Sequence, residues 1–410
     1  MSSARRRRRI KLIGIVVSNG VPLLGVVVLG WNAAVLLLLY WLEFGSAVVW
    51  VLFRALFAGR PSEVEDRFLL VGAIGSKQGA IPLPLTNVSI RLSSLPIICL
   101  ATPILTVLWI LVGAFTVGLA GANSLDSGVG ATVVLGAFGI FLSHGVTTGV
   151  NYFGGGEYHD NSAQTAIQGV FIQLIAIFFG VLFALPFVFE TFGEDVALGV
   201  PLLAGVVFVK FAFDLVTHYR DRLVAFDERI GGVFGWVYDP PASPSIDPLT
   251  TVERRVRPSR RGLALGGIAN TSRYAGTVYI GIFSLCLGVL AALAGVPAVA
   301  VLFALISVLF PIVAAIIDYW IRYGWMEYRV ANGSILGYDR VAGSSQWRVD
   351  TGDVRRLHVE RSRVDAHLDT ETVIMELADR ELRVPHLEDP GPVLDAFDHH
   401  PGRPGEDPRS

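Results

Sequence analysis

The stretch AAVLLLLYWLEFGSAVVWVLF, residues 33–53, decides the fold class of this chain. As a helix that rises about 1.5 Å per residue, it is long enough to cross the hydrocarbon core of a bilayer. A single carboxylate, Glu43, lies at its centre. A charge at mid-membrane costs about 2.5–3.5 kcal/mol on insertion scales, so such residues usually have a partner and mark a functional interior. We therefore expect Glu43 to lie inside a helical bundle.

The composition predicts an integral membrane protein. Of the 410 residues, 52% are hydrophobic and 17% are charged, whereas about a quarter of the residues are charged in ordinary soluble proteins. Apolar runs of about 20 residues are typical of membrane-spanning helices. Eight such runs occur, near residues 11–29, 31–53, 97–120, 130–153, 166–189, 196–218, 274–294 and 298–321. We therefore predict a mainly α fold, a polytopic bundle of about eight spans.

The basic residues predict how these spans are oriented. Arg5–Arg9 and Lys11 precede the first span, and the cluster Arg254–Arg261 precedes the seventh. The predicted outer loops contain no Lys or Arg and lie around residues 123–128, 191–195 and 295–297. Because basic residues concentrate on the cytoplasmic side, we predict a cell-membrane protein with both termini cytoplasmic. Arg5–Arg9 could also suit a nucleic acid, but a basic run directly before a span more often anchors topology. We expect the lipid bilayer, and no nucleic acid, as its partner.

Changes of pattern divide the chain into five pieces. Prolines 240, 241 and 244 break any regular element after the sixth span. After Tyr323 the long apolar runs give way to short alternating ones. The predicted pieces are a six-span membrane domain (1–222), a cytoplasmic linker (223–272), a two-span hairpin (273–323), a β-rich domain (324–400) and a disordered tail (401–410).

Short stretches separated by turn residues predict strands in the β-rich piece, at 326–330, 334–338, 346–349, 355–360, 372–377 and 381–384. Its characteristic residues are Tyr328-Arg329-Val330, Trp347-Arg348-Val349, Asp353-Val354, Val359-Glu360-Arg361-Ser362, Thr372-Val373-Ile374 and Asp389-Pro390 before Val393. With the preceding hairpin, residues of about 255–400 resemble bacterial pleckstrin-homology-like domains, which often follow two spans. The resemblance implies an assembly or regulatory module with a possible protein partner, rather than an enzyme.

The charge of the C-terminal piece bears on what it binds. From Gly324 onward there are 17 acidic and 11 basic residues, a formal charge of −6. A net acidic domain is poorly suited to an anionic lipid surface unless its basic residues gather on one face.

The N-terminal piece carries its own set of characteristic residues: Leu29-Gly30-Trp31, Tyr40-Trp41-Leu42-Glu43, Ser143-His144, Asn151-Tyr152, Gly154-Gly155-Gly156-Glu157-Tyr158, Lys210, Asp214-Leu215 and His218. On these, residues of about 10–225 resemble a multi-pass membrane family known only as a domain of unknown function and frequent in halophilic archaea. Relatives often carry an arginine and a histidine in the fifth span, where this chain has Gly169–Gln173. That departure argues against a shared histidine metal site, and the resemblance implies no activity.

Polar residues within the spans form a predicted intramembrane cluster. We estimate the depth of each polar residue from the outer end of its span, at about 1.5 Å per helical residue. The depths are similar, about 17–24 Å, for Asn19, Glu43, His144, Gln173 and Lys210. Lys210, Asp214 and His218 share one helix face because residues four apart are neighbours. We predict that Glu43 pairs with Lys210, with His144 and Asp214 close by.

Three functions remain open for this cluster. The first is structural: polar side chains join helices, in an uncharacterised membrane protein whose C-terminal domain docks or regulates a partner. The alternative is a transporter or channel for protons or a small solute, since intramembrane carboxylates and histidines line such paths. The third is a membrane-embedded enzyme with His144 as general base. No nucleophile or metal set stands at a recognisable spacing, so the sequence favours a role without catalytic residues, metal or cofactor.

Overall fold

The computed structural model describes residues 2–62, 69–84, 88–121, 129–192, 198–229, 246–249, 251–269, 271, 275–331 and 333–398. The chain forms two compact units, the first made of residues 1–60 and 97–241 and the second of residues 61–96 and 242–410. The outer loop predicted at 123–128, most of the loop at 191–195, the middle of the linker and the tail 401–410 lie outside the described residues.

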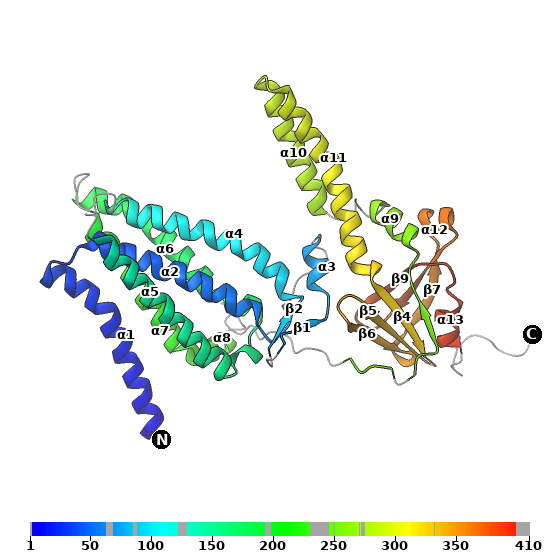
Figure 1. Cartoon of the computed structure of the whole chain (residues 1–410), viewed down its shortest axis with the longest axis horizontal. Coiled ribbons are helices and arrows are strands. Elements are labelled where there is room, and N and C mark those ends of the chain that lie inside the picture. The colour runs from blue at the N-terminus through cyan, green and yellow to red at the C-terminus, as the bar shows by residue number, and fades with distance from the viewer. Residues whose placement is uncertain are drawn as a thin grey trace, which may run out of the picture. The chain divides into compact units, whose positions relative to one another are not determined.

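The first unit is a bundle of long apolar helices (Figure 1). Its helices are α1 (Ser2–Leu29), α2 (Ala33–Leu56), α4 (Ser94–Gly113) with the π-helical turn η1 (Ala114–Gly118), α5 (Val129–Thr147) with the π-helical turn η3 (Thr148–Gly154), α6 (Ala163–Phe192), α7 (Gly199–His218) and α8 (Arg220–Arg229). A short 3-10 turn, η4 (Glu157–His159), precedes α6. α2 contacts α5, α6 and α7, so the stretch quoted at the outset runs through the middle of the bundle.

Helix α2 begins at a well-formed cap. The Asn32 side chain accepts hydrogen bonds from the backbone N–H groups of Ala34 at 2.9 Å and Val35 at 3.4 Å, which satisfies donors that have no partner within the helix. Leu37, Phe44 and other side chains along its length are buried in the core of the bundle. The helix therefore has a defined start and a continuous packed face.

Two tryptophans join α2 to α4 by a reciprocal contact. The Trp41 and Trp109 rings stack with centroids 4.5 Å apart. The Trp41 Nε1–H donates to the Trp109 carbonyl at 2.9 Å, and the Trp109 Nε1–H donates to the Trp41 carbonyl at 2.8 Å. Each indole lies against a glycine of the opposite helix, Trp41 on Gly113 and Trp109 on Gly45. The glycines thus make room for two half-buried indoles whose polar atoms are both satisfied.

Within the part of the chain that the structure describes, seven helices are long and apolar enough to cross a membrane, as expected of an integral membrane protein. They are Leu12–Leu29, Ala33–Leu56, Ser94–Gly118, Gly130–Gly154, Ala163–Thr191, Gly199–His218 and Pro297–Gly324. Among the described residues, the run predicted at 274–294 contributes only a shorter apolar helix, Gly281–Leu293. The structure therefore supports seven of the eight predicted spans by length and composition.

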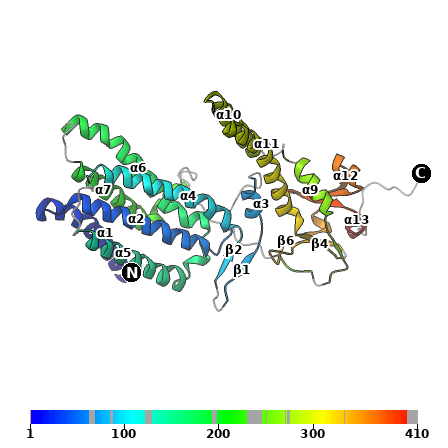
Figure 2. The same cartoon turned by 45° about the horizontal axis from the view of Figure 1, so that its top comes forward.

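Within the described residues, the second unit combines a helical hairpin with three antiparallel sheets, the smallest of which is the pair β1-β2. Its helices are α3 (Val71–Gly75), α9 (Arg260–Ala269), α10 (Ala275–Leu293), α11 (Pro297–Tyr319) with η6 (Trp320–Gly324), α12 (Arg363–Leu368) and α13 (Gly391–Asp398). Its strands are β1 (Ala80–Pro82), β2 (Ser89–Arg91), β3 (Arg254–Val256), β4 (Met326–Ala331), β5 (Ser334–Asp339), β6 (Ser344–Asp350), β7 (Arg356–Glu360), β8 (Glu371–Glu376) and β9 (Glu381–Leu387). α10 and α11 run side by side away from the sheets (Figures 1 and 2).

The two larger sheets share one hydrophobic core. One sheet has the order β3-β4-β5-β6 and the other β7-β8-β9, with all neighbours antiparallel. Tyr328 and Ile335 from the first sheet pack with Met375 and Val384 from the second, and Val393 of α13 joins them. The predicted strands from residue 326 onward coincide with β4–β9 to within a few residues, because turn residues separate the short runs that form them.

The structure differs from the predicted domain boundaries at two places. The segment 61–96, which the sequence assigned to the membrane domain, belongs to the second unit. Residues 254–256, assigned to the linker, form β3 and pair with β4. Both elements find partners more than 70 residues away in the chain, which local patterns do not reveal.

An ion pair holds the segment 61–96 in the second unit. Lys77 Nζ lies 2.7 Å from Asp339 Oδ2, and both side chains are buried. Burial lowers the pKa of Lys77, and the Asp339 carboxylate opposes that shift. Beside the pair, the Gln78 N–H donates to Gln346 Oε1 at 2.8 Å, and Gln346 Nε2 donates to the Gln78 carbonyl at 2.6 Å. We call these four residues the clasp.

Gly113→Ala tests the tryptophan contact. A Cβ at this position would overlap the Trp41 indole nitrogen, so we expect a loss of about 1–3 kcal/mol in the free energy of unfolding, the usual cost of overpacking. The measurement is thermal unfolding in nanodiscs. Gly139→Ala is the matched control, because no described atom lies within 4 Å of the added Cβ. Equal melting temperatures for the two variants would contradict the close contact.

Candidate functional site

The predicted intramembrane cluster is centred on Lys210 of α7. Its Nζ lies 3.3 Å from Glu43 Oε1 on α2 and 3.8 Å from Asp214 Oδ2, one turn further along α7. Asn19 of α1 donates from Nδ2 to Asp214 Oδ2 at 2.8 Å. Helices α1, α2 and α7 thus meet at four polar side chains.

Asn19 is held firmly but is not fully satisfied. Its side chain also donates to the Ile15 carbonyl at 2.9 Å, one turn earlier on α1. The residue is 3% exposed, and its Oδ1 has no hydrogen-bond partner among the described residues. An unpaired buried acceptor costs about 1–3 kcal/mol, so this atom marks a place where a further donor would stabilise the cluster.

The other predicted members lie around this centre or outside it. His144 Nδ1 is 3.2 Å from Ser46 Oγ, and Ser46 follows Glu43 by one turn on α2. The His218 ring packs edge-on against Tyr219, with centroids 4.8 Å apart. Gln173 is half-buried on α6 and makes no hydrogen bond within the part of the chain that the structure describes. His144 is therefore a neighbour of the centre, whereas His218 and Gln173 are separate from it.

The charges of the cluster do not balance. Glu43 and Asp214 are two carboxylates, and Lys210 supplies one ammonium group, so the formal charge is −1 when all three are ionised. The exposed fractions of these side chains are 25%, 34% and 19%. An uncompensated charge away from water is costly. No group of three or more His, Cys, Asp or Glu among the described residues could hold a metal ion.

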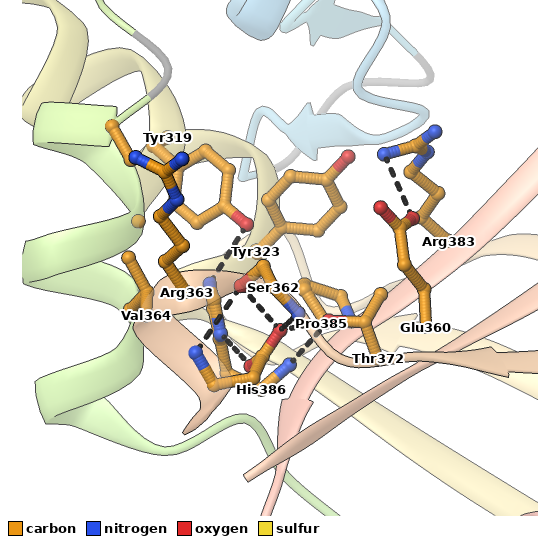
Figure 3. A pocket seen from close by; sticks show the side chains of 13 residues that line it. Tyr319, Tyr323, Glu360, Ser362, Arg363, Val364, Thr372, Arg383, Pro385 and His386 are labelled. Carbon is orange, nitrogen blue, oxygen red and sulfur yellow. Dashed lines mark hydrogen bonds and ion pairs between the residues drawn. The ribbon is translucent and has the colours of Figure 1, made fainter. Parts of the chain in front are cut away.

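A second polar site, not predicted from the sequence, lies in the second unit (Figure 3). The His386 ring on β9 bridges two residues: its Nδ1 is 2.6 Å from Asp365 Oδ1 on α12, and its Nε2 is 3.0 Å from the Tyr319 hydroxyl on α11. All three side chains are buried. We call this set the Asp365–His386–Tyr319 triad.

The Asp365 carboxylate is saturated with hydrogen bonds. Besides His386, it accepts from the Ser362 backbone N–H and hydroxyl and from the hydroxyls of Thr370 and Thr372, at 2.6–3.2 Å. Burial alone would raise the pKa of Asp365, but hydrogen bonds from Ser362, Thr370 and His386 hold that pKa below its usual range. One local signal was visible in the sequence: Ser362 and Asp365 have the spacing of a helix capping box, which the structure contains.

Comparison with known protein families finds a match that covers the N-terminal part of the chain. A model for a family of unknown function, DUF6498, matches residues 1–229, more than half of the chain. The chain belongs to this family. The match includes every residue of the intramembrane cluster and ends before β3. No curated protein and no solved structure matches the chain.

A double-mutant cycle measures the central pair of this DUF6498 protein. Glu43→Gln and Lys210→Met are made singly and together, and we expect a coupling of about 1–3 kcal/mol because each single change removes the 3.3 Å contact between the two charges. The measurement is the free energy of unfolding in nanodiscs. The control cycle uses Arg361→Met and Asp369→Asn, a solvent-exposed pair for which coupling should be small. Additive effects at Glu43 and Lys210 would rule the pair out.

Proposed function

We propose that this protein is a membrane-embedded regulatory scaffold. The intramembrane cluster fixes the packing of the bundle, and the β-rich part of the second unit docks a protein partner and transmits the docked state to α2. We propose that α10 also spans the membrane, which brings the number of spans to eight. The protein then lies in the cell membrane with both termini in the cytoplasm.

One observation carries the transmission step. The segment 61–96 follows α2 directly in the chain and leads into α4, yet it is clasped within the second unit by Lys77 and Asp339. We infer that a displacement of β5, which carries Asp339, is passed along the chain to α2. Glu43 lies on that same helix. The route is covalent between α2 and the segment, and a buried ion pair completes it.

The docking role rests on architecture and charge. Sheets of four and three antiparallel strands followed by a terminal helix, α13, support a pleckstrin-homology-like fold. A formal charge of −6 from Gly324 onward favours a basic protein surface as the partner over an anionic lipid surface. Domains of this kind serve as binding modules, which agrees with a scaffold.

Hydrogen–deuterium exchange of the full chain in nanodiscs tests the transmission. Lys77→Met leaves the buried Asp339 carboxylate without its cation, so we expect at least tenfold faster exchange in residues 71–92 and also in residues 48–56 of α2. Arg361→Met, at an exposed ion pair of the same unit, is the control and should leave both regions unchanged.

The outcome for α2 decides the proposal. Protection of β8 must persist in the Lys77→Met protein, which shows that the sheets remain folded. Faster exchange confined to residues 71–92, with α2 at its original rate, would mean that the clasp is local and that the second unit does not regulate the bundle.

A second candidate function is movement of protons or a small cation, favoured by the excess carboxylate of the cluster. In vesicles that contain a pH-sensitive dye, Glu43→Gln should lower proton flux at least tenfold, because it removes one of two carboxylates that share Lys210. Glu190→Gln, at the exposed end of α6, is the control. Wild-type flux no greater than that of empty vesicles would remove this candidate.

A further inference from the structure

The triad has the geometry of an activated hydroxyl group. A carboxylate that accepts from Nδ1 fixes the imidazole in the tautomer whose Nε2 is an acceptor. That Nε2 is 3.0 Å from the Tyr319 oxygen, within the reach that a general base needs. The order carboxylate, imidazole and hydroxyl is the arrangement by which proteins activate a weak nucleophile. The proposed scaffold function does not use the triad.

The protein maintains this geometry against strain. His386 has φ = +54°, a left-handed backbone conformation that is uncommon for any residue other than glycine. The His386 carbonyl accepts from the Ser259 N–H at 2.8 Å, just before α9. Gly262 of α9 lies so close to the ring that a Cβ there would be 2.5 Å from the His386 Cβ. Strained residues held by their surroundings cluster at active and binding sites.

A cavity of about 320 Å³ borders the triad, and Tyr319, Asp365 and His386 all line it. This volume is at the lower end of the range, about 300–1,000 Å³, that small-molecule sites occupy. Arg363 and Arg383 also line the cavity (Figure 3). Glu381 holds Arg383 at 2.6 Å, whereas Arg363 makes no ion pair within the described ranges. The cavity thus offers a cation for a negatively charged oxygen.

We propose that the Asp365–His386–Tyr319 triad hydrolyses a small carboxylic ester bound in this cavity, with the Tyr319 oxygen as nucleophile and His386 as general base. Arg363 stabilises the negative oxygen of the tetrahedral intermediate. Asp365 is a positioning residue, which stays ionised and balances the charge on His386. The proposal is independent of the scaffold function.

The reaction has two balanced steps. In the first, the Tyr319 oxygen attacks the ester carbonyl carbon and its proton passes to His386 Nε2. The bond from that carbon to the alkoxy oxygen breaks, and the alcohol leaves with the proton from Nε2. In the second, water attacks the tyrosyl ester and gives a proton to Nε2. The bond to Tyr319 breaks, the acid is released, and the proton returns to the Tyr319 oxygen.

Covalent labelling of the full chain in nanodiscs tests the proposal. The probe is phenylsulfonyl fluoride, which reacts with nucleophilic hydroxyls, and mass spectrometry locates the label. We expect Tyr319 to react at least tenfold faster than Tyr338, a half-buried tyrosine of β5. p-Nitrophenyl acetate is the substrate for turnover, which Tyr319→Phe should abolish and Tyr338→Phe should leave unchanged.

Two variants separate chemistry from packing. His386→Asn tolerates the positive φ better than most residues and should remove labelling of Tyr319 while the protein keeps its melting temperature to within a few degrees. Asp365→Asn should lower kcat at least tenfold without raising KM, and should change the dependence of kcat on pH. An unlabelled Tyr319 in the wild-type protein, labelling no faster than at Tyr338, or turnover that survives Tyr319→Phe would overturn the proposal. The comparison of labelling at Tyr319 and Tyr338 in the wild-type protein tests the proposal even if a variant fails to fold.

Discussion

The ion pair between Lys210 and Glu43 is the interaction on which the membrane bundle depends. Apolar contacts alone give helices little reason to associate in lipid, whereas a charge within a span must find a partner. Lys210 finds Glu43 on α2 at 3.3 Å and Asp214 on its own helix at 3.8 Å. Asn19 then brings α1 to Asp214. Polar contacts around one ammonium group therefore join three helices of the bundle.

A second ion pair between a lysine and a carboxylate lies outside the bundle. The chain contains three lysines, Lys11, Lys77 and Lys210, and two of them pair with carboxylates in positions where a lone charge is costly. Lys77 with Asp339 secures the segment between α2 and α4 in the second unit, as Lys210 with Glu43 secures α2 in the first. Arginine provides most of the remaining positive charge.

Sequence reasoning found what depends on local pattern and on depth. Apolar length predicted the seven helices that are long enough to span a membrane, short runs between turn residues predicted β4–β9, and similar depth suggested that Glu43 and Lys210 could meet. Depth alone does not specify the rotation of a helix, which is why Gln173, at a similar predicted depth, makes no hydrogen bond in the described structure. Similarly, His218 shares the face of Lys210 and Asp214 but lies two turns from Lys210 and packs against Tyr219.

These patterns do not predict contacts between residues that are far apart in the chain. Lys77 and Asp339 are 262 positions apart, and Tyr319 and His386 are 67 apart. Trp41 and Trp109 each carry an indole N–H that must be satisfied when buried, but nothing in the sequence indicates that each donates to the other's carbonyl. Local sequence patterns also do not predict that β3 pairs with β4, because the α10–α11 hairpin separates the two strands in the chain.

The protonation state and neighbours of Lys210 test the central claim most directly. With three lysines in the chain, solid-state NMR of Nζ-¹⁵N-labelled protein in lipid bilayers resolves each side chain, and ¹³C-labelled carboxylates report their proximity. The account predicts an ammonium signal from Lys210 with a dipolar coupling to the Glu43 carboxylate that corresponds to the 3.3 Å contact and disappears in Glu43→Gln. A neutral Lys210 amine, or a coupling unaffected by Glu43→Gln, would contradict it.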